Sequence, residues 1–359
     1  MHHRLPGDRG MGDDSWFVRL TPFQRQETKR QTEHKRCNWP SLGDGTWGKN
    51  RNHSYPHILP AGYIEYGFAP GVFPRLAAYL GSHDIQLHTE ILNLRSSQAC
   101  CWNFFFPLRE DLPMAADALR FLLIGVKEVL SIELEYTGEE GATIWLGEPP
   151  GGKRGQNRTS VDTAVRWIDD RGQQRITFVE WKYTEAKFGT CGGYKSDGND
   201  DKNACRTLRV ELVRPKRDCY LSKGTTVRND RHYWERLRDA GINLELFDGR
   251  AGCPFMGPFY QLMRLHLLAA HTKSHLKCID RVEVAVVCFR GNTDLLKIPD
   301  NLACLGPSIP EAWCKLLGGE MSFHTAFIED IVRDACKKAR IERSAWMRHF
   351  QGRYGLEVK

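Results

Sequence analysis

Two strand-like runs separated by a short turn constrain the fold of this chain most strongly. Residues 159–168 and 174–183 are rich in β-branched and aromatic residues, and each is about the length of one strand. Between them, Asp170-Arg171-Gly172 is typical of a tight turn, because Asp bonds its own backbone and Gly adopts positive φ without strain. The pattern therefore predicts an antiparallel β-hairpin.

Three charged residues occupy matching positions on this hairpin. Asp162 lies on the first run, whereas Glu180 and Lys182 lie two residues apart on the second. Side chains at i and i+2 of a strand point to the same face. With Gly172 as the centre of the turn, Asp162 precedes it by 10 residues and Glu180 follows it by 8. The hairpin should therefore place Asp162 roughly opposite Glu180.

Two carboxylates and an ammonium on one face of a sheet suggest a metal site. Carboxylate oxygens are what Mg²⁺ takes from proteins while it keeps several waters, and Mn²⁺ is the alternative ion. A lysine beside such a site can orient a water or stabilise charge on a scissile phosphate. We therefore predict Asp162 and Glu180 as metal ligands, and Asp162, Glu180 and Lys182 as the catalytic residues.

The remaining sequence predicts helices and strands around the hairpin. In chain order we expect a helix at 86–106, a helix at 113–130, a strand at 131–136, a short strand at 143–146, the hairpin, a long polar insertion at 187–252, a helix at 254–271, a strand at 281–289 and a helical C-terminal tail at 322–359. This order indicates an α/β (α+β) domain with a small mixed central sheet flanked by helices.

Charge is distributed unevenly along the chain. The formal net charge is +7, from 51 Lys and Arg against 44 Asp and Glu. Residues 1–55 contribute +4 and are poor in aliphatic residues, so we expect a basic, poorly ordered leader with one helical turn, followed by a single domain over 56–359. Residues 205–238 carry +6 and include Tyr220, Tyr233 and Trp234. This segment and the basic end 337–353 are the predicted contacts to a nucleic-acid backbone.

No apolar run approaches the roughly 20 residues that a membrane span needs, and the first ten residues lack the apolar core of a secretory signal. We therefore expect a cytoplasmic protein without membrane contact. In that compartment the twelve cysteines would be thiols or metal ligands rather than disulfides.

The pattern D-x(17)-E-x-K across a hairpin resembles the active site of the PD-(D/E)XK nuclease superfamily, which has a restriction-endonuclease-like fold. A closer resemblance is to a bacterial family of this superfamily with a Ser-Ser-Gln-Ala helix, here residues 96–99, that ends in Pro-Leu, here residues 107–108. The resemblance covers roughly residues 85–290. It implies a Mg²⁺-dependent DNA endonuclease, in defence against foreign DNA or in DNA repair, with a homodimer as one arrangement.

The superfamily often adds a further acid from the first helix. The resemblance leaves four candidates open for this place, without a choice among them: Gln98, Glu128, Glu133 and Glu135. Gln98 occupies the third position of the Ser-Ser-Gln-Ala sequence.

Four cysteines lie in or just after the insertion: Cys191, Cys205, Cys219 and Cys253. Their spacings of 14, 14 and 34 residues are not those of zinc knuckles, but a metal would explain how a long polar loop is held. Some nucleases of the superfamily carry an iron–sulfur cluster beside the active site, so we expect either [4Fe–4S] or Zn²⁺ here. Two alternative functions stay open: a non-catalytic nucleic-acid-binding protein, and a metal- or redox-sensing protein.

Overall fold

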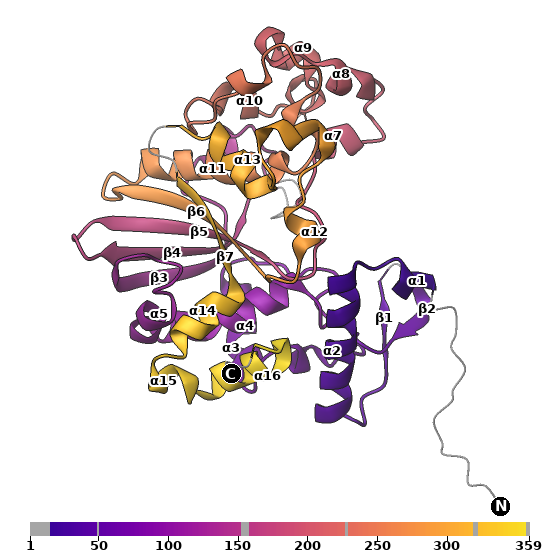
Figure 1. The fold of residues 1–359 in the computed structure, drawn as a ribbon, viewed down its shortest axis with the longest axis vertical. Coiled ribbons are helices and arrows are strands. Elements are labelled where there is room, and N and C mark those ends of the chain that lie inside the picture. Colours follow the sequence, from indigo (N-terminus) through magenta and orange to yellow (C-terminus); the bar gives the residue numbers. More distant parts are fainter. Residues whose placement is uncertain (1–14, 49, 152–157, 227–228, 319–321, 357–359) are drawn as a thin grey trace, which may run out of the picture.

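The computed structural model describes residues 15–48, 50–151, 158–226, 229–318 and 322–356. Its centre is a five-stranded mixed sheet with the strand order β3-β4-β5-β6-β7 (Figure 1). The β3–β4 and β4–β5 pairs are antiparallel, whereas the β5–β6 and β6–β7 pairs are parallel. A separate two-stranded sheet joins β1 and β2. The strands are β1 (Gly45–Trp47), β2 (Asn50–Tyr55), β3 (Val126–Tyr136), β4 (Val161–Asp169), β5 (Gln174–Lys182), β6 (Arg281–Cys288) and β7 (Ser322–Phe327).

Helices cover both faces of the central sheet (Figure 1). The longer ones are α2 (Pro22–Asn38), α3 (Val72–Ser82), α4 (Ser97–Glu110), α5 (Leu112–Ala118), α11 (Phe259–His275), α13 (Ile309–Leu316), α14 (Ile328–Ala335) and α16 (Ala345–Tyr354). The shorter ones are α1 (Ser15–Val18), α6 (Ala142–Trp145), α7 (Gly192–Lys195), α8 (Lys202–Thr207), α9 (Pro215–Asp218), α10 (Tyr233–Arg236), α12 (Thr293–Leu296) and α15 (Ala339–Glu342).

Two hydrophobic cores hold these layers together. On one face, α4, α5, α14 and α16 pack against the sheet, and on the other α11 and α13 do so. The observed architecture is therefore the expected mixed α/β fold with helices on both sides of a small sheet. Burial of apolar surface on both faces provides the main driving force for this arrangement.

The predicted hairpin is present as β4 and β5. The backbone N–H of Gly172, which has φ +81°, donates to the carbonyl of Asp169, and the Asp169 carboxylate accepts from the N–H groups of Arg171 and Gln173 at 3.0 and 2.9 Å. The register sets Thr163 against Val179. In this antiparallel register, Asp162 on β4 and Glu180 on β5 are the next facing residues, which confirms the expected opposition of the two acids.

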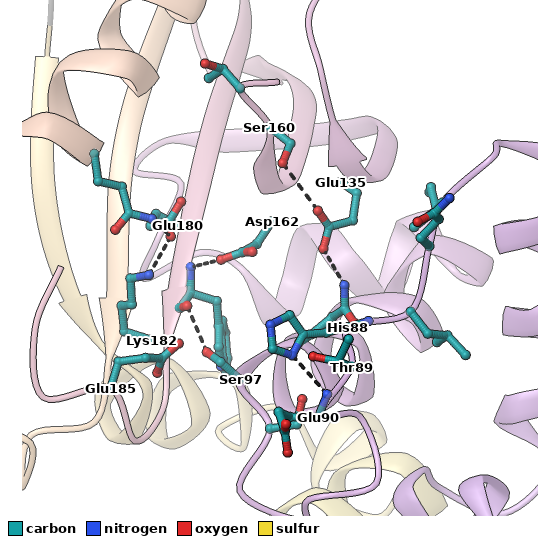
Figure 2. Close-up of a pocket in the computed structure, with 18 of the residues that line it drawn as sticks. His88, Thr89, Glu90, Ser97, Glu135, Ser160, Asp162, Glu180, Lys182 and Glu185 are labelled. Carbon is teal, nitrogen blue, oxygen red and sulfur yellow. Dashed lines mark hydrogen bonds and ion pairs between the residues drawn. The ribbon is translucent and has the colours of Figure 1, made fainter. Parts of the chain in front are cut away.

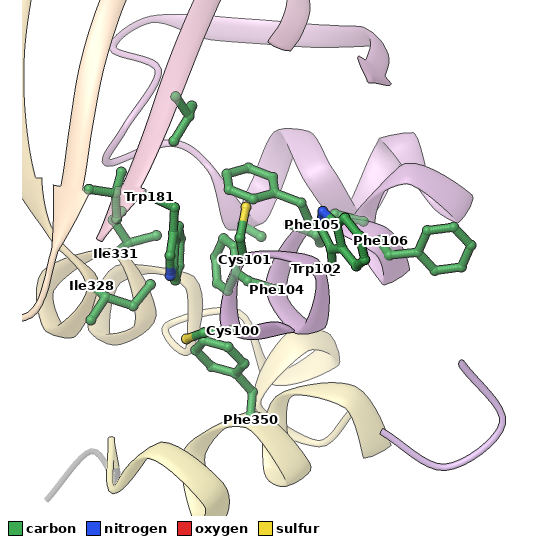
Figure 3. Close-up of a cluster of buried hydrophobic side chains, with 14 of the residues drawn as sticks. Cys100, Cys101, Trp102, Phe104, Phe105, Phe106, Trp181, Ile328, Ile331 and Phe350 are labelled. Atoms are coloured by element: carbon green, nitrogen blue, oxygen red, sulfur yellow. The ribbon is translucent and has the colours of Figure 1, made fainter. Parts of the chain in front are cut away.

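Helix α4 is the central helix of the first core. Ser96 caps it by accepting from the N–H of Ala99 at 3.2 Å, and residues 99–108 are buried. Figure 3 shows Phe104 of this helix near Trp181 of β5 and Phe350 of α16. The Trp181 ring lies 5.4 Å from that of Phe104 and 5.7 Å from that of Phe105. Because side chains alternate along a strand, anchoring Trp181 in this core directs its two neighbours, Glu180 and Lys182, to the opposite face.

Several predicted elements differ from the observed ones. The helix expected at 86–106 starts only at Ser97, after its cap, and it continues through Pro107 to Glu110. The helix expected at 113–130 ends at Ala118, and β3 begins at Val126, directly after Gly125 with φ +81°. The short strand expected at 143–146 is helix α6. The first part of the tail expected to be helical, 322–327, is the edge strand β7.

The N-terminal segment also differs from the expected leader. Helix α2 has a capping box, in which Thr21 and Gln24 exchange hydrogen bonds of 3.0 and 3.2 Å, and it runs for 17 residues. Its Gln31 side chain donates to the Tyr183 hydroxyl at 2.9 Å and to the Arg353 carbonyl at 3.1 Å. The described part of residues 1–55 therefore packs onto the sheet-bearing domain, whereas residues 1–14 lie outside the described residues.

Within the described ranges, no helix combines the length and the apolar character needed to cross a membrane.

Candidate active site

A cleft of about 850 Å³ lies at the end of the hairpin (Figure 2). It is lined by the loop 84–90, the first turn of α4, Glu135 near the end of β3, the start of β4, the end of β5 and three residues of α11. Asp162, Glu180 and Lys182 all lie in this cleft, together with Gln98. The structure therefore brings together the three residues that we predicted as catalytic and Gln98, one of the four candidates for the additional position.

Asp162 is fixed by the neighbouring strand. Its Oδ2 atom accepts a hydrogen bond of 2.7 Å from the backbone N–H of Trp181. Enclosure by protein atoms, followed by the charges of Glu180 and Glu135, raises the pKa of the Asp162 carboxyl well above its ordinary value, although Lys182 partly opposes this. Like charges within a few ångströms in a poorly solvated site disfavour ionisation. The cleft thus disfavours a negative charge on Asp162 as long as no cation is bound there.

Glu180 and Lys182 form a buried ion pair. Their Oε1 and Nζ atoms lie 2.7 Å apart, and the two residues are 4% and 7% exposed. Gln261 of α11 donates to the same Glu180 oxygen at 2.6 Å. Burial alone would lower the pKa of Lys182, but Glu180, Glu185 and Asp162 together raise it above its ordinary value. The lysine therefore carries its charge at neutral pH.

Of the three acids among the candidates left open by the sequence, Glu135 is the one that lines the cleft. Glu135 has a backbone φ of +50°, which is rare for a residue with a Cβ. The residue is only 9% exposed and lines the cleft. The Nε2 atom of Gln98 donates to Glu135 at 2.8 Å, and the Ser160 hydroxyl donates at 3.4 Å. Glu133 instead lies 3.5 Å from Arg166, and exposed Glu128 lies outside the cleft lining.

Each residue of the Ser-Ser-Gln-Ala sequence has a distinct contact. Ser96 caps α4, and Ser97 donates to the Trp181 carbonyl at 3.0 Å and accepts from the Tyr183 N–H at 3.2 Å, on either side of Lys182. Gln98 links Glu135 to the loop 84–90, because its Oε1 atom accepts from the N–H of His88 at 2.9 Å. Ala99 is 1% exposed in the core. The motif therefore docks the helix onto the hairpin and the cleft.

Sequence reasoning missed several residues of the cleft. His88 was expected on a helix, but it lies in the loop 84–90, where its Nδ1 atom accepts from the N–H of Glu90 at 3.2 Å (Figure 2). Arg95, Arg158 and Arg264 also line the cleft. A signal was present for Arg95, since it directly precedes the Ser-Ser-Gln-Ala sequence, but nothing in the spacing pointed to Arg264.

The four cysteines of the insertion find no support as ligands. Within the described ranges, no three His, Cys, Asp or Glu side chains are grouped so that they could hold a metal ion. Burial raises the pKa of Cys191 to about 11, with neighbouring Cys219 and Cys205 adding to the effect, and burial likewise raises that of Cys253. A [4Fe–4S] or Zn²⁺ site at the four cysteines therefore stays a prediction.

The predicted basic surfaces are only partly available. Tyr233 is 4% exposed and donates to Glu148 at 2.8 Å, so it is not placed to stack on a base. At the C-terminal end, Arg353 is fully buried, and its Nε atom donates to Gln31 at 3.4 Å. These two residues therefore stabilise the fold.

One comparison with known proteins identifies a family. Residues 23–355 match the family model described as restriction endonuclease associating with ARP, and the chain belongs to this family. No curated protein and no solved structure matches the chain. The match covers nearly all of the described residues, including α2, and it agrees with the restriction-endonuclease-like resemblance of the hairpin motif.

Proposed function

We propose that this member of a restriction endonuclease family is a divalent-metal-dependent phosphodiester hydrolase that cuts DNA. The observation that carries the proposal is the placement of Asp162 across the hairpin from Glu180 and Lys182, within one cleft. A protein that only binds nucleic acid has no need of two carboxylates and an ammonium at the bottom of a cleft, because burying such charges costs free energy.

The donor set fits Mg²⁺ or Mn²⁺. Asp162 and Glu180 offer two hard carboxylates to an ion that keeps several waters, and Glu135 lines the same cleft, although the three acids of the described chain are not grouped closely enough to form a three-ligand site. The raised pKa of Asp162, caused by its enclosure and then by Glu180 and Glu135, supports the fit, because a cation would relieve that repulsion. Asp162 and Glu180 would hold the ion, which supplies positive charge to the scissile phosphate and acidifies a nearby water.

The chain's own residues do the rest of the work. Lys182 is held by its ion pair with Glu180, so that its ammonium can orient the attacking water and stabilise negative charge on the phosphate. Gln261 fixes the Glu180 carboxylate from the other side. Gln98 and Ser160 fix Glu135. These hydrogen bonds hold the charged groups in place before substrate arrives, which reduces the reorganisation that the reaction requires.

The partners and setting form part of the same proposal. DNA is the proposed substrate, in defence against foreign DNA or in DNA repair. The family description names an association with ARP, and we extend that association to this chain as a proposal. We also propose a cytoplasmic protein, with a homodimer as one arrangement for cutting both strands. Light scattering with and without DNA tests the oligomeric state, and co-purification tests the association with ARP.

A plasmid-nicking assay tests the proposed activity. The purified protein should nick supercoiled DNA in Mg²⁺ or Mn²⁺ but not in EDTA. Asp162→Asn should lose nicking and keep DNA binding, whereas Glu128→Gln, a matched acid-to-amide change outside the cleft lining, should behave like the wild type. DNA binding without nicking in either metal would favour the non-catalytic alternative.

A further inference from the structure

Two cations of the cleft, Arg95 and Lys182, differ in how their charge is compensated. Lys182 is paired with Glu180, and a third cation, Arg264, lies 3.6 Å from Glu148. The Arg95 guanidinium, by contrast, has no carboxylate oxygen of the described residues within 4.0 Å, the longest distance at which an ion pair forms. Its Nε atom is buried and has no hydrogen-bond partner within the described part of the chain. An enclosed guanidinium without an anion is unfavourable unless a ligand supplies one.

The backbone of Arg95 is held firmly beside the site. Its N–H donates to the Oδ1 atom of Asn93 at 3.0 Å, and its carbonyl accepts from the Thr184 hydroxyl at 3.3 Å. Thr184 follows Lys182 by two residues, and Ser96, which follows Arg95, caps α4. Arg95 is therefore tied both to the helix of the Ser-Ser-Gln-Ala motif and to the end of the catalytic strand.

Nearby groups do not replace the missing partner. Tyr183 and Glu27 act on Arg95 electrostatically, but the Glu27 carboxylate already accepts from Arg30 at 3.1 Å and from the Tyr183 hydroxyl at 2.7 Å. Burial lowers the pKa of Arg95 to about 10, despite these two neighbours. Burial, and after it the charge of Arg95, hold the pKa of His57 well below its ordinary value. The local surroundings thus leave positive charge uncompensated.

We propose that Arg95 binds a backbone phosphate of the nucleic acid that occupies the cleft. The inference rests on the proposed function and deepens it, because it names the group that recognises the substrate's phosphodiester chain. A planar guanidinium matches a phosphate with two parallel hydrogen bonds, which an ammonium cannot make. Bound phosphate oxygens would satisfy the free Nε atom and compensate the charge. Arg95 then positions the chain beside Lys182, so that the neighbouring phosphate faces the carboxylates.

The test is DNA binding as a function of salt. Binding of a fluorescein-labelled DNA duplex is measured by anisotropy between 50 and 300 mM KCl, with Ca²⁺ in place of Mg²⁺ so that cleavage does not interfere. Arg95→Gln should weaken binding about tenfold and reduce the slope of log K against log salt by about one, the value for one lost phosphate contact. Arg95→Lys should keep the slope and bind more weakly than the wild type, because the bidentate geometry is lost.

The matched control is Arg75→Gln. Arg75 is exposed on α3, makes two hydrogen bonds of 2.7 and 2.9 Å to Glu110, and does not line the cleft. Its substitution should change neither the affinity nor the slope. If Arg95→Gln keeps the wild-type affinity and slope while the wild type binds DNA, the inference is wrong and the proposed hydrolase stands. If the wild type binds no DNA, the proposed function fails as well.

A second measurement uses the unaltered protein, in case Arg95→Gln does not fold. Phenylglyoxal modifies accessible arginines, and mass spectrometry locates the modified sites. Bound DNA should protect Arg95 at least several-fold and leave Arg75 unprotected. Equal modification of Arg95 with and without DNA would overturn the inference.

Discussion

Replacing Ser97 by Ala tests how the Ser-Ser-Gln-Ala motif supports the catalytic strand. The Ser97 hydroxyl bridges the Trp181 carbonyl and the Tyr183 N–H, at 3.0 and 3.2 Å. Alanine removes both hydrogen bonds, but the Tyr183 N–H keeps a second acceptor, the Glu185 carboxylate, at 2.9 Å. Only the carbonyl loses its side-chain partner outright, so the free energy of unfolding should fall by about 1–2 kcal/mol.

Urea denaturation measures this change, and plasmid nicking measures its effect on Lys182, which lies between the two bridged residues. We expect slower nicking with little change in DNA affinity, since Ser97→Ala removes no charge. Ser82→Ala is the matched control, because the Ser82 hydroxyl bonds only within the end of α3 and its loss should cost less than about 0.5 kcal/mol. If Ser97→Ala is as stable and as active as Ser82→Ala, the motif does not act through these hydrogen bonds.

Three further predictions concern single side chains. The pKa of Asp162 is raised in the folded protein, so the folded protein binds this proton more tightly than the unfolded chain does. The free energy of unfolding therefore falls as the pH rises above the ordinary pKa of Asp. Asp162→Asn removes this penalty, so urea denaturation should show that it stabilises the metal-free protein more at pH 8 than at pH 5. Gln98→Met removes the hydrogen bond to Glu135 and should lower nicking about 10–100-fold, partly recovered at higher Mg²⁺; an unchanged Mg²⁺ titration would contradict this. Tyr183→Phe removes the hydroxyl that donates to the buried Glu27 carboxylate at 2.7 Å. The free energy of unfolding should fall by about 1–3 kcal/mol in the same urea assay. An unchanged urea midpoint would show that this contact does not hold α2.

The hairpin and its charged residues could be predicted because local rules determine them. The turn chemistry of Asp169 and Gly172 fixes the register, and two-residue periodicity then places Glu180 and Lys182 on one face. Asp162 on the first strand and Glu180 and Lys182 on the second then reach the same cleft as soon as the two strands pair in this register.

Other parts of the fold depend on contacts that no local pattern contains. Helix α2 looked like a solvated leader because its buried face is polar, and its Gln31 finds partners 152 and 322 residues away. Strand β7 was hidden in an apparently helical tail, since only pairing with β6 decides its conformation. The cleft position of Arg95 depends on the docking of α4 against β5, which the sequence does not encode locally.

The central claim is that Lys182 acts in hydrolysis at the carboxylate pair, and single-turnover cleavage tests it most directly. Lys182→Gln keeps a polar side chain with a hydrogen-bond donor but removes the charge that pairs with Glu180. With DNA binding in Ca²⁺ as the reference, we predict that cleavage in Mg²⁺ falls at least about 100-fold while affinity changes by less than about threefold. Cleavage by Lys182→Gln at the wild-type rate would contradict the account.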